Sequence, residues 1–234
     1  MKKFRKLLVV LVIMLTISLS SCGVFRLEMA MNRLEKKSFT LDSTMLINMK
    51  ISYPGISRTL EQVIDMKIET DHINTYTTTT DNGTPEYMYT KVEDDKVQIY
   101  EKGSEKWRLV DTQDVSEYSN NMEIVEIDGD VREYFKRKGN KWVGNTEKLS
   151  ELFEEVLQEY ADEFGASGLE ITRLAIDKYD ITLKGINVSE IEIVISISMA
   201  AQGVSLDMSL SMFMNYSDIG STYVKELRKS QIAR

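Results

Sequence analysis

The chain has 234 residues, 42% of them hydrophobic, and 29 Lys and Arg against 37 Asp and Glu give it a formal net charge of −8. A surface this acidic repels phosphate backbones and anionic headgroups, which argues against nucleic-acid binding and against electrostatic attachment to membranes. A single cysteine excludes an internal disulfide, and only 2 prolines and 12 glycines argue against a long flexible linker, so we expect one domain.

The first 21 residues have the pattern of a secretory signal peptide. Met1–Lys6 is basic, and residues 7–17 are an uncharged apolar run, short for a membrane span. Residues 19–22 read Leu-Ser-Ser-Cys and resemble the lipobox of bacterial lipoproteins. The resemblance implies cleavage before Cys22, a diacylglycerol on its sulfur, and an extracytoplasmic protein anchored to the cell membrane. Removing four basic residues and no acid changes the net charge from −8 to −12.

A short helix and a run of strands are predicted next. Leu27, Met31 and Leu34 are spaced as on one face of a helix within residues 23–37. Apolar and polar residues alternate over 39–51 and again over 60–69, which is typical of strands with one buried face. Further strands are predicted at the following ranges: 73–80, 87–92, 97–101 and 107–110. Short turns between these six strands indicate an antiparallel meander.

The stretch from 111 to 144 is compatible with two structures. Val115, Tyr118 and Met122 fit a helical stripe, whereas a hairpin around Asp128-Gly129-Asp130 fits the same stretch equally well. The Gly139-Asn140 pair is expected to turn the chain back to the sheet. Asn145 or Thr146 is then expected to cap a helix that runs over 149–164 and ends at Gly165.

The last third is predicted to return to sheet. Strands are expected at 171–176 and 178–184, followed by a long hairpin of 191–199 with 204–214, which has one apolar face. The polar residues 218–234 are expected to fray after Val224.

The predicted strands carry more apolar surface than the few predicted helices can cover. Either the sheet curls until its own side chains fill the interior, or helices cover it partly and leave a hollow for an apolar ligand. Flexible methionine side chains suit variable acyl chains, although they suit an irregular core equally well. The predicted lining of such a cavity is Met45, Ile47, Met49, Ile64, Met66, Ile193, Ile195, Ile197, Met208, Leu210 and Met212.

The order of these parts resembles the LolA/LolB and LppX/LprG-like lipoproteins. The resemblance implies an α+β fold in which a strongly curved antiparallel sheet, a half-barrel, has helices on its concave side and carries a lipid there. No short sequence signature of these families is present, so Cys22 is the only functional residue that the resemblance assigns. The expected organisation is a signal peptide at 1–21, an anchor and short helix at 22–37, a LolA-like domain at 38–224 and a polar tail at 225–234.

Catalytic, metal and cofactor sites are not predicted. His72 is the only histidine, and no nucleophile elbow, zinc-binding helix, phosphate loop or dinucleotide turn appears. Asp94-Asp95 and Asp128-Gly129-Asp130 stand where turns are expected and lack the further ligands of a calcium loop.

The alternative function is a surface lipoprotein with a filled core that binds another protein, as an adhesin or scaffold does. Its candidate contact residues are aromatic, and the competing interpretation is that these side chains cover the rim of the sheet. They are Tyr87, Tyr89, Tyr100, Trp107 and Trp142.

Overall fold

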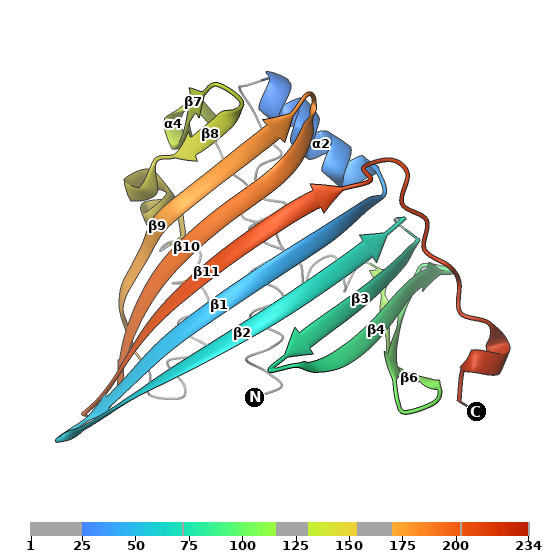
Figure 1. Cartoon of the computed structure of the whole chain (residues 1–234), viewed down its shortest axis with the longest axis horizontal. Coiled ribbons are helices and arrows are strands. Elements are labelled where there is room, and N and C mark those ends of the chain that lie inside the picture. The colour runs from blue at the N-terminus through green and yellow to red at the C-terminus, as the bar shows by residue number, and fades with distance from the viewer. Residues whose placement is uncertain (1–24, 72, 116–130, 154–169, 202, 234) are drawn as a thin grey trace.

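A single antiparallel sheet dominates the computed structural model, which describes residues 25–71, 73–115, 131–153, 170–201 and 203–233 (Figure 1). The strands are β1 (Phe39–Tyr53), β2 (Ile56–Thr70), β3 (Asn74–Asp81), β4 (Thr84–Glu93), β5 (Lys96–Lys102), β6 (Trp107–Asp114), β7 (Phe135–Lys138), β8 (Lys141–Gly144), β9 (Glu170–Lys184), β10 (Asn187–Ala201) and β11 (Val204–Ser217). The sheet is accompanied by α2 (Phe25–Lys36), α4 (Val131–Tyr134) and the 3-10 turn η1 (Lys229–Gln231).

The eleven strands form one sheet in the order β6-β5-β4-β3-β2-β1-β11-β10-β9-β8-β7. The predicted six-strand meander and the predicted long hairpin β10–β11 are both confirmed. Pairing of β1 with β11 joins these two groups, and the sheet does not close, because β6 and β7 lie at its two ends.

Two hairpin turns have the backbone conformation that their sequences predict. Asn82 and Gly83 both have positive φ, 49° and 81°, as a two-residue turn between twisted strands requires. Asp94 and Asp95 also have positive φ, 52° and 58°, and connect β4 to β5. Asp94-Asp95 is therefore a turn, as predicted.

The structure differs from the prediction between 171 and 184, where one continuous strand, β9, replaces two short ones. Lys178 pairs with Val194 and Ile176 pairs with Ile195, so Asp177 is an extra residue in the ladder. A β-bulge of this kind shifts the alternation by one residue without ending the strand. The prediction of two separate strands on either side of Asp177 was therefore wrong.

The described part of the ambiguous stretch contains a helical turn and a small hairpin. Residues 131–134 form α4, and β7 and β8 follow with the turn at Gly139 and Asn140 that was predicted. The predicted hairpin at 128–130 lies outside the described residues. Asn145 caps the next helix: its Oδ1 accepts a hydrogen bond from the Lys148 N–H at 3.4 Å. This helix covers 146–153 within the described residues, which confirms its start.

The C-terminal segment packs on the sheet instead of fraying, which corrects the prediction for the residues after Val224. Val224 is buried, the Ala233 N–H donates to the Trp107 carbonyl at 2.7 Å, and Ile232 forms a bridge with Trp107. Figure 1 shows this segment running down the β3–β4 side of the sheet. Its few apolar residues cover aromatic side chains that would otherwise face water.

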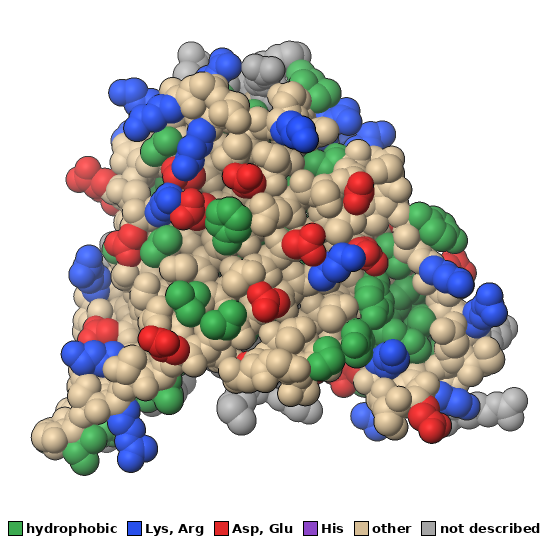
Figure 2. Space-filling model, viewed as in Figure 1, with side chains coloured by type: hydrophobic (Ala, Val, Ile, Leu, Met, Phe, Trp, Pro, Cys, Tyr) green, Lys and Arg blue, Asp and Glu red, His purple; other side chains and the backbone are tan. Residues whose placement is uncertain are grey.

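The two faces of the sheet are distinguished by the alternation of side chains along each strand. We call the face that carries Met45, Ile193 and Met212 the core face. The other, which carries Thr44, Asp65 and Phe213, is called the opposite face. Figure 2 views the opposite face, where charged side chains are spread over the long strands.

Candidate functional site

The core face is built from rows of apolar side chains that run across the long strands. One row is Ile64, Met45, Met212 and Ile193, contributed in turn by β2, β1, β11 and β10. Neighbours in such a row lie about 5 Å apart, so their side chains touch. All four side chains are at most 7% exposed. The rows form one continuous apolar surface at the centre of the molecule.

The structure brings all the predicted cavity residues together on this core face. Nine are buried members of a single hydrophobic cluster, and two, Met49 and Ile197, are partly buried against it. The nine are Met45, Ile47, Ile64, Met66, Ile193, Ile195, Met208, Leu210 and Met212. That they line a cavity for an apolar ligand stays a prediction. Cys22, the predicted lipidation site, lies outside the described residues.

Two helical segments contribute to the same cluster. From α2 come Leu27, Met31 and Leu34, which were predicted to form its packed face. From residues 146–153 come Leu149 and Phe153. In addition, the Arg33 Nε–H of α2 donates to the Asn187 Oδ1 of β10 at 2.7 Å, which fixes this helix against the start of that strand. Both helical segments therefore cover the core face.

Burial along the rows falls toward the ends of the β1–β2 and β10–β11 hairpins. In the row Leu60, Met49, Met208 and Ile197, only Met208 is buried, and Leu60 is 54% exposed. At the hairpin end itself, Tyr53 is 50% and Ile56 is 60% exposed. Figure 1 shows these hairpins extending past the rest of the molecule at its lower left. The apolar surface thus continues from the buried interior to an exposed end, which we call the open end.

Within the described residues, two buried polar atoms of this region have no hydrogen-bond partner. They are the Ser43 hydroxyl and the Trp142 indole N–H, and each residue is only 4% exposed. The register places both in the same cross-sheet row, through Met214, Ile191 and Ile181. An unpaired buried polar group costs about 1–3 kcal/mol. This row consequently contributes less to the stability of the fold than the fully apolar rows beside it.

Burial also changes the acidity of tyrosines around the cluster. It raises the pKa of Tyr179 and of Tyr216 far above the ordinary value of a phenol, because the charged phenolate is not solvated there. Tyr216 lies edge-on to Phe39, with ring centroids 5.7 Å apart. Both side chains are therefore neutral components of the core at physiological pH.

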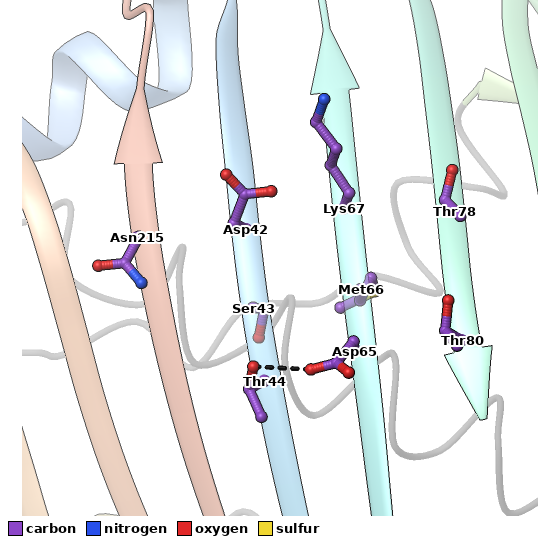
Figure 3. A pocket seen from close by; sticks show the side chains of 9 residues that line it. All are labelled: Asp42, Ser43, Thr44, Asp65, Met66, Lys67, Thr78, Thr80 and Asn215. Carbon is purple, nitrogen blue, oxygen red and sulfur yellow. Dashed lines mark hydrogen bonds between the residues drawn. The ribbon is translucent and has the colours of Figure 1, made fainter. Parts of the chain in front are cut away.

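The opposite face carries a polar hollow of about 240 Å³ over β11, β1, β2 and β3. Its lining is Asp42, Ser43, Thr44, Asp65, Met66, Lys67, Thr78, Thr80 and Asn215 (Figure 3). The alternation puts Ser43 and Met66 on the core face, so the other seven supply the side chains that face the hollow. Thr44 donates its hydroxyl to Asp65 at 2.8 Å, and Lys67 pairs with Glu69 at 2.8 Å. The sequence offered no signal for this hollow.

A second hydrophobic cluster lies on the opposite face of β3–β6. Tyr89 is 1%, Trp107 is 6% and Tyr100 is 9% exposed, and Val224 of the C-terminal segment packs on them. The Tyr89 hydroxyl donates to Asn74 at 2.5 Å, and burial raises its pKa to about 12. Trp142 belongs to the main cluster instead. The aromatic residues considered for an exposed contact patch are thus largely buried, which favours the interpretation that they cover the sheet.

Among the described residues, no three His, Cys, Asp or Glu side chains are grouped so that they could hold a metal ion. No helix in these same ranges is both long and apolar enough to cross a bilayer. His72 and Asp128-Gly129-Asp130 lie outside the described residues.

Comparisons with known proteins give distant likenesses only. The fold is similar to that of the ywiB protein from Bacillus subtilis, at 10% identity and a TM-score of 0.22, with 77% of this chain and 96% of that chain covered. It is also similar to a DUF1329 family protein from Desulfovibrio piger, at 10% identity and a TM-score of 0.21, with 87% and 93% covered. No protein-family model and no curated protein matches the sequence. At this level of similarity neither protein indicates a role for this chain, and the resemblance expected from the sequence stays a prediction.

Proposed function

We propose that this protein is a lipid-anchored extracytoplasmic lipoprotein that holds an acyl chain or a similar apolar ligand between the core face and its helices. The observation that supports the proposal is the continuity of the apolar rows from the buried cluster to the open end. Leu60 is 54% exposed there, although its row continues into the buried Met208. An acyl chain at this end would cover apolar surface that now faces water, which is favourable in proportion to the area covered.

The proposal includes a LolA-like half-barrel in which the helices occupy the concave side of the sheet. Its support is that α2 and residues 146–153 both pack on the core face, and that the hydrophobic residues of β1, β10 and β11 point toward them. A ligand between sheet and helices would replace contacts between side chains. Methionines in that layer, such as Met45 and Met212, adapt to such a change more easily than branched side chains do.

The proposed anchor lies close to this layer in the sequence. Cys22 precedes the start of α2 at Phe25 by three residues, and Leu27 is already in the buried cluster. One acyl chain gives only reversible membrane attachment, whereas two or three hold a protein stably. In this proposal, lipidation at Cys22 keeps the apolar layer beside a bilayer, from which its ligand comes.

Uptake of a fluorescent fatty acid tests the proposed function. The chain from residue 23 onward is purified, its co-purified lipids are identified by mass spectrometry, and the delipidated protein is titrated. We expect saturable uptake with one ligand per chain. The Leu60→Asp variant is expected to bind at least about tenfold more weakly, because a carboxylate at the open end must be desolvated beside the ligand. No co-purifying lipid together with no uptake contradicts the proposal.

Val63→Asp is the matched control. Val63 lies on the same strand and is 45% exposed, but its side chain is on the opposite face. The same charge is introduced there without touching the apolar rows. Equal loss of uptake in both variants would contradict a ligand site on the core face.

A further inference from the structure

The polar hollow on the opposite face is separate from the proposed lipid site. It lies over the middle of the sheet, and its seven facing side chains come from four adjacent strands (Figure 3). The sheet itself separates this hollow from the apolar rows. A ligand in the hollow therefore does not compete with one on the core face.

Backbone groups cannot provide the contacts in this hollow. Around it β1 is paired with β2 and β11, and β2 is paired with β3. The N–H and C=O groups of these strands are therefore used within the ladders. A peptide that adds a strand needs an unpaired sheet edge, and none is present here. Recognition in the hollow depends on side chains.

The side chains offer both donors and acceptors. Asp42 and Asp65 accept hydrogen bonds, and Lys67 donates. Asn215, Thr78 and Thr80 can each do both. Such a set complements the hydroxyl group, which is donor and acceptor at once. With Glu69 beside Lys67, carboxylates outnumber ammonium groups, so phosphate or another anion is repelled.

An apolar shelf adjoins the hollow on the same face. Phe213 pairs across the strands with Thr44 and is 43% exposed. In the next row lie Leu46 and Val63, which are 36% and 45% exposed. These three residues, the apolar shelf, border the polar lining along one side. The ligand that fits has one apolar surface and a rim of hydroxyl groups.

We infer that the hollow and the apolar shelf bind an uncharged saccharide. The C–H face of a sugar ring packs on Phe213, and its hydroxyls donate to Asp65 and Asp42 and accept from Lys67 and Asn215. The volume of about 240 Å³ lies below the roughly 300–1,000 Å³ of sites for drug-sized ligands, so one or two rings fit. The sheet holds both groups of side chains in fixed positions.

The test is calorimetric titration of the full chain with uncharged trisaccharides. The panel consists of cellotriose, maltotriose and tri-N-acetylchitotriose, and the detergent is lauryldimethylamine oxide, which has no sugar headgroup. We expect at least one of them to bind with a dissociation constant below about 1 mM. Asp65→Ala and Phe213→Ser are each expected to weaken this binding by about tenfold or more. Asn215→Ala is a third variant that leaves the Thr44–Asp65 hydrogen bond in place.

Two control variants match the first two substitutions. Glu61→Ala removes an exposed carboxylate from the same strand and face as Asp65, beyond the apolar shelf. Tyr223→Ser removes an aromatic ring that is 78% exposed and lies outside the hollow. Neither control is expected to change saccharide affinity, and thermal melting confirms that each variant is folded.

Several results would overturn the inference. They are no binding by any trisaccharide up to about 10 mM, unchanged affinity in Asp65→Ala, Phe213→Ser and Asn215→Ala, or equal losses in the controls. Tighter binding of a neutral tripeptide than of the trisaccharides would also overturn it. Because Asp65→Ala leaves the core face intact, fatty-acid uptake should be unchanged. Failure of the saccharide site is then distinguishable from failure of the proposed lipid site.

Discussion

The two hydrophobic clusters lie on opposite faces of one sheet and are covered in different ways. The main cluster, on the core face and centred on β1, β2 and β9–β11, is mostly aliphatic and is covered by helical segments. The second, on the opposite face of β3–β6, is mostly aromatic and is covered by the C-terminal segment through Val224, Leu227 and Ile232. A sheet that twists over eleven strands can thus bury different faces at its two ends. The first of these clusters reaches an exposed apolar end, which is why the proposed lipid site is placed there.

The largest expected effect comes from placing a charge in the main cluster. Ile193 is fully buried between Met212 and Tyr179 of the neighbouring strands. We expect Ile193→Asp to lower the free energy of unfolding by about 5 kcal/mol or more, because the carboxylate would be buried without a partner. Chemical denaturation measures this. Val194→Asp, on the opposite face of the same strand, is the control and should cost about 1 kcal/mol or less. Similar losses in the two would show that the faces are not distinct.

Removing residues 224–234 tests the second cluster. The truncation uncovers Tyr89, Tyr100 and Trp107, and we expect it to lower the free energy of unfolding by about 2–4 kcal/mol. In a Trp142→Phe background, the fluorescence of Trp107 should shift to longer wavelength and become accessible to quenchers. Tyr223→Ser, which changes an exposed residue, should leave the spectrum unchanged. A Trp107 spectrum unaffected by the truncation would mean that this segment does not cover the cluster in solution.

The pH dependence of stability reports on both clusters at once. Burial raises the pKa of Tyr89 to about 12, and it raises the pKa of Tyr179 and Tyr216 further. The folded state therefore binds the phenol protons more tightly than the unfolded state does. The stability that these phenols contribute is fully present below pH ~10, the unfolded-state pKa, and is lost as the pH rises from there through the raised folded-state pKa, by about 1.4 kcal/mol per pH unit for each tyrosine. Denaturation between pH 8 and 12 measures the slope. Tyr216→Phe should reduce it above pH ~10, and an unchanged slope would contradict a buried phenol there.

The sequence was sufficient to predict the main cluster but not the second one. Alternation over 39–51, 191–199 and 204–214 follows directly from one buried face, so the long strands and their apolar rows were predictable. The cluster of Tyr89, Tyr100 and Trp107 depends instead on contacts with a segment more than a hundred residues away, which alternation does not encode. That segment contains only isolated apolar residues among charged ones, and it was therefore expected to fray.

The polar hollow was unpredictable for a related reason. Its lining residues alternate with apolar ones, and each separately looks like an ordinary solvated side chain of a strand. Only the pairing of β11, β1, β2 and β3 brings Asn215, Asp42 and Asp65 onto one surface. Register is a property of strand pairs, and one sequence does not specify which residues will be neighbours across strands.

The smallest effect expected is a gain in stability at Ser43. Its hydroxyl is buried in the main cluster, between Met66 and Met214, without a hydrogen-bond partner in the described part of the chain. Ser43→Ala removes the unpaired group while preserving the backbone, so we expect the free energy of unfolding to rise by about 1 kcal/mol. Ser211→Ala, at a half-exposed position on the opposite face of β11, should change it by no more than about 0.5 kcal/mol. If Ser43→Ala instead destabilises the ligand-free protein, the hydroxyl has a partner in solution. If the variant is more stable and also takes up the fatty acid more weakly, the Ser43 hydroxyl contacts the bound ligand, and the main cluster is then both the core of the fold and the wall of the binding site.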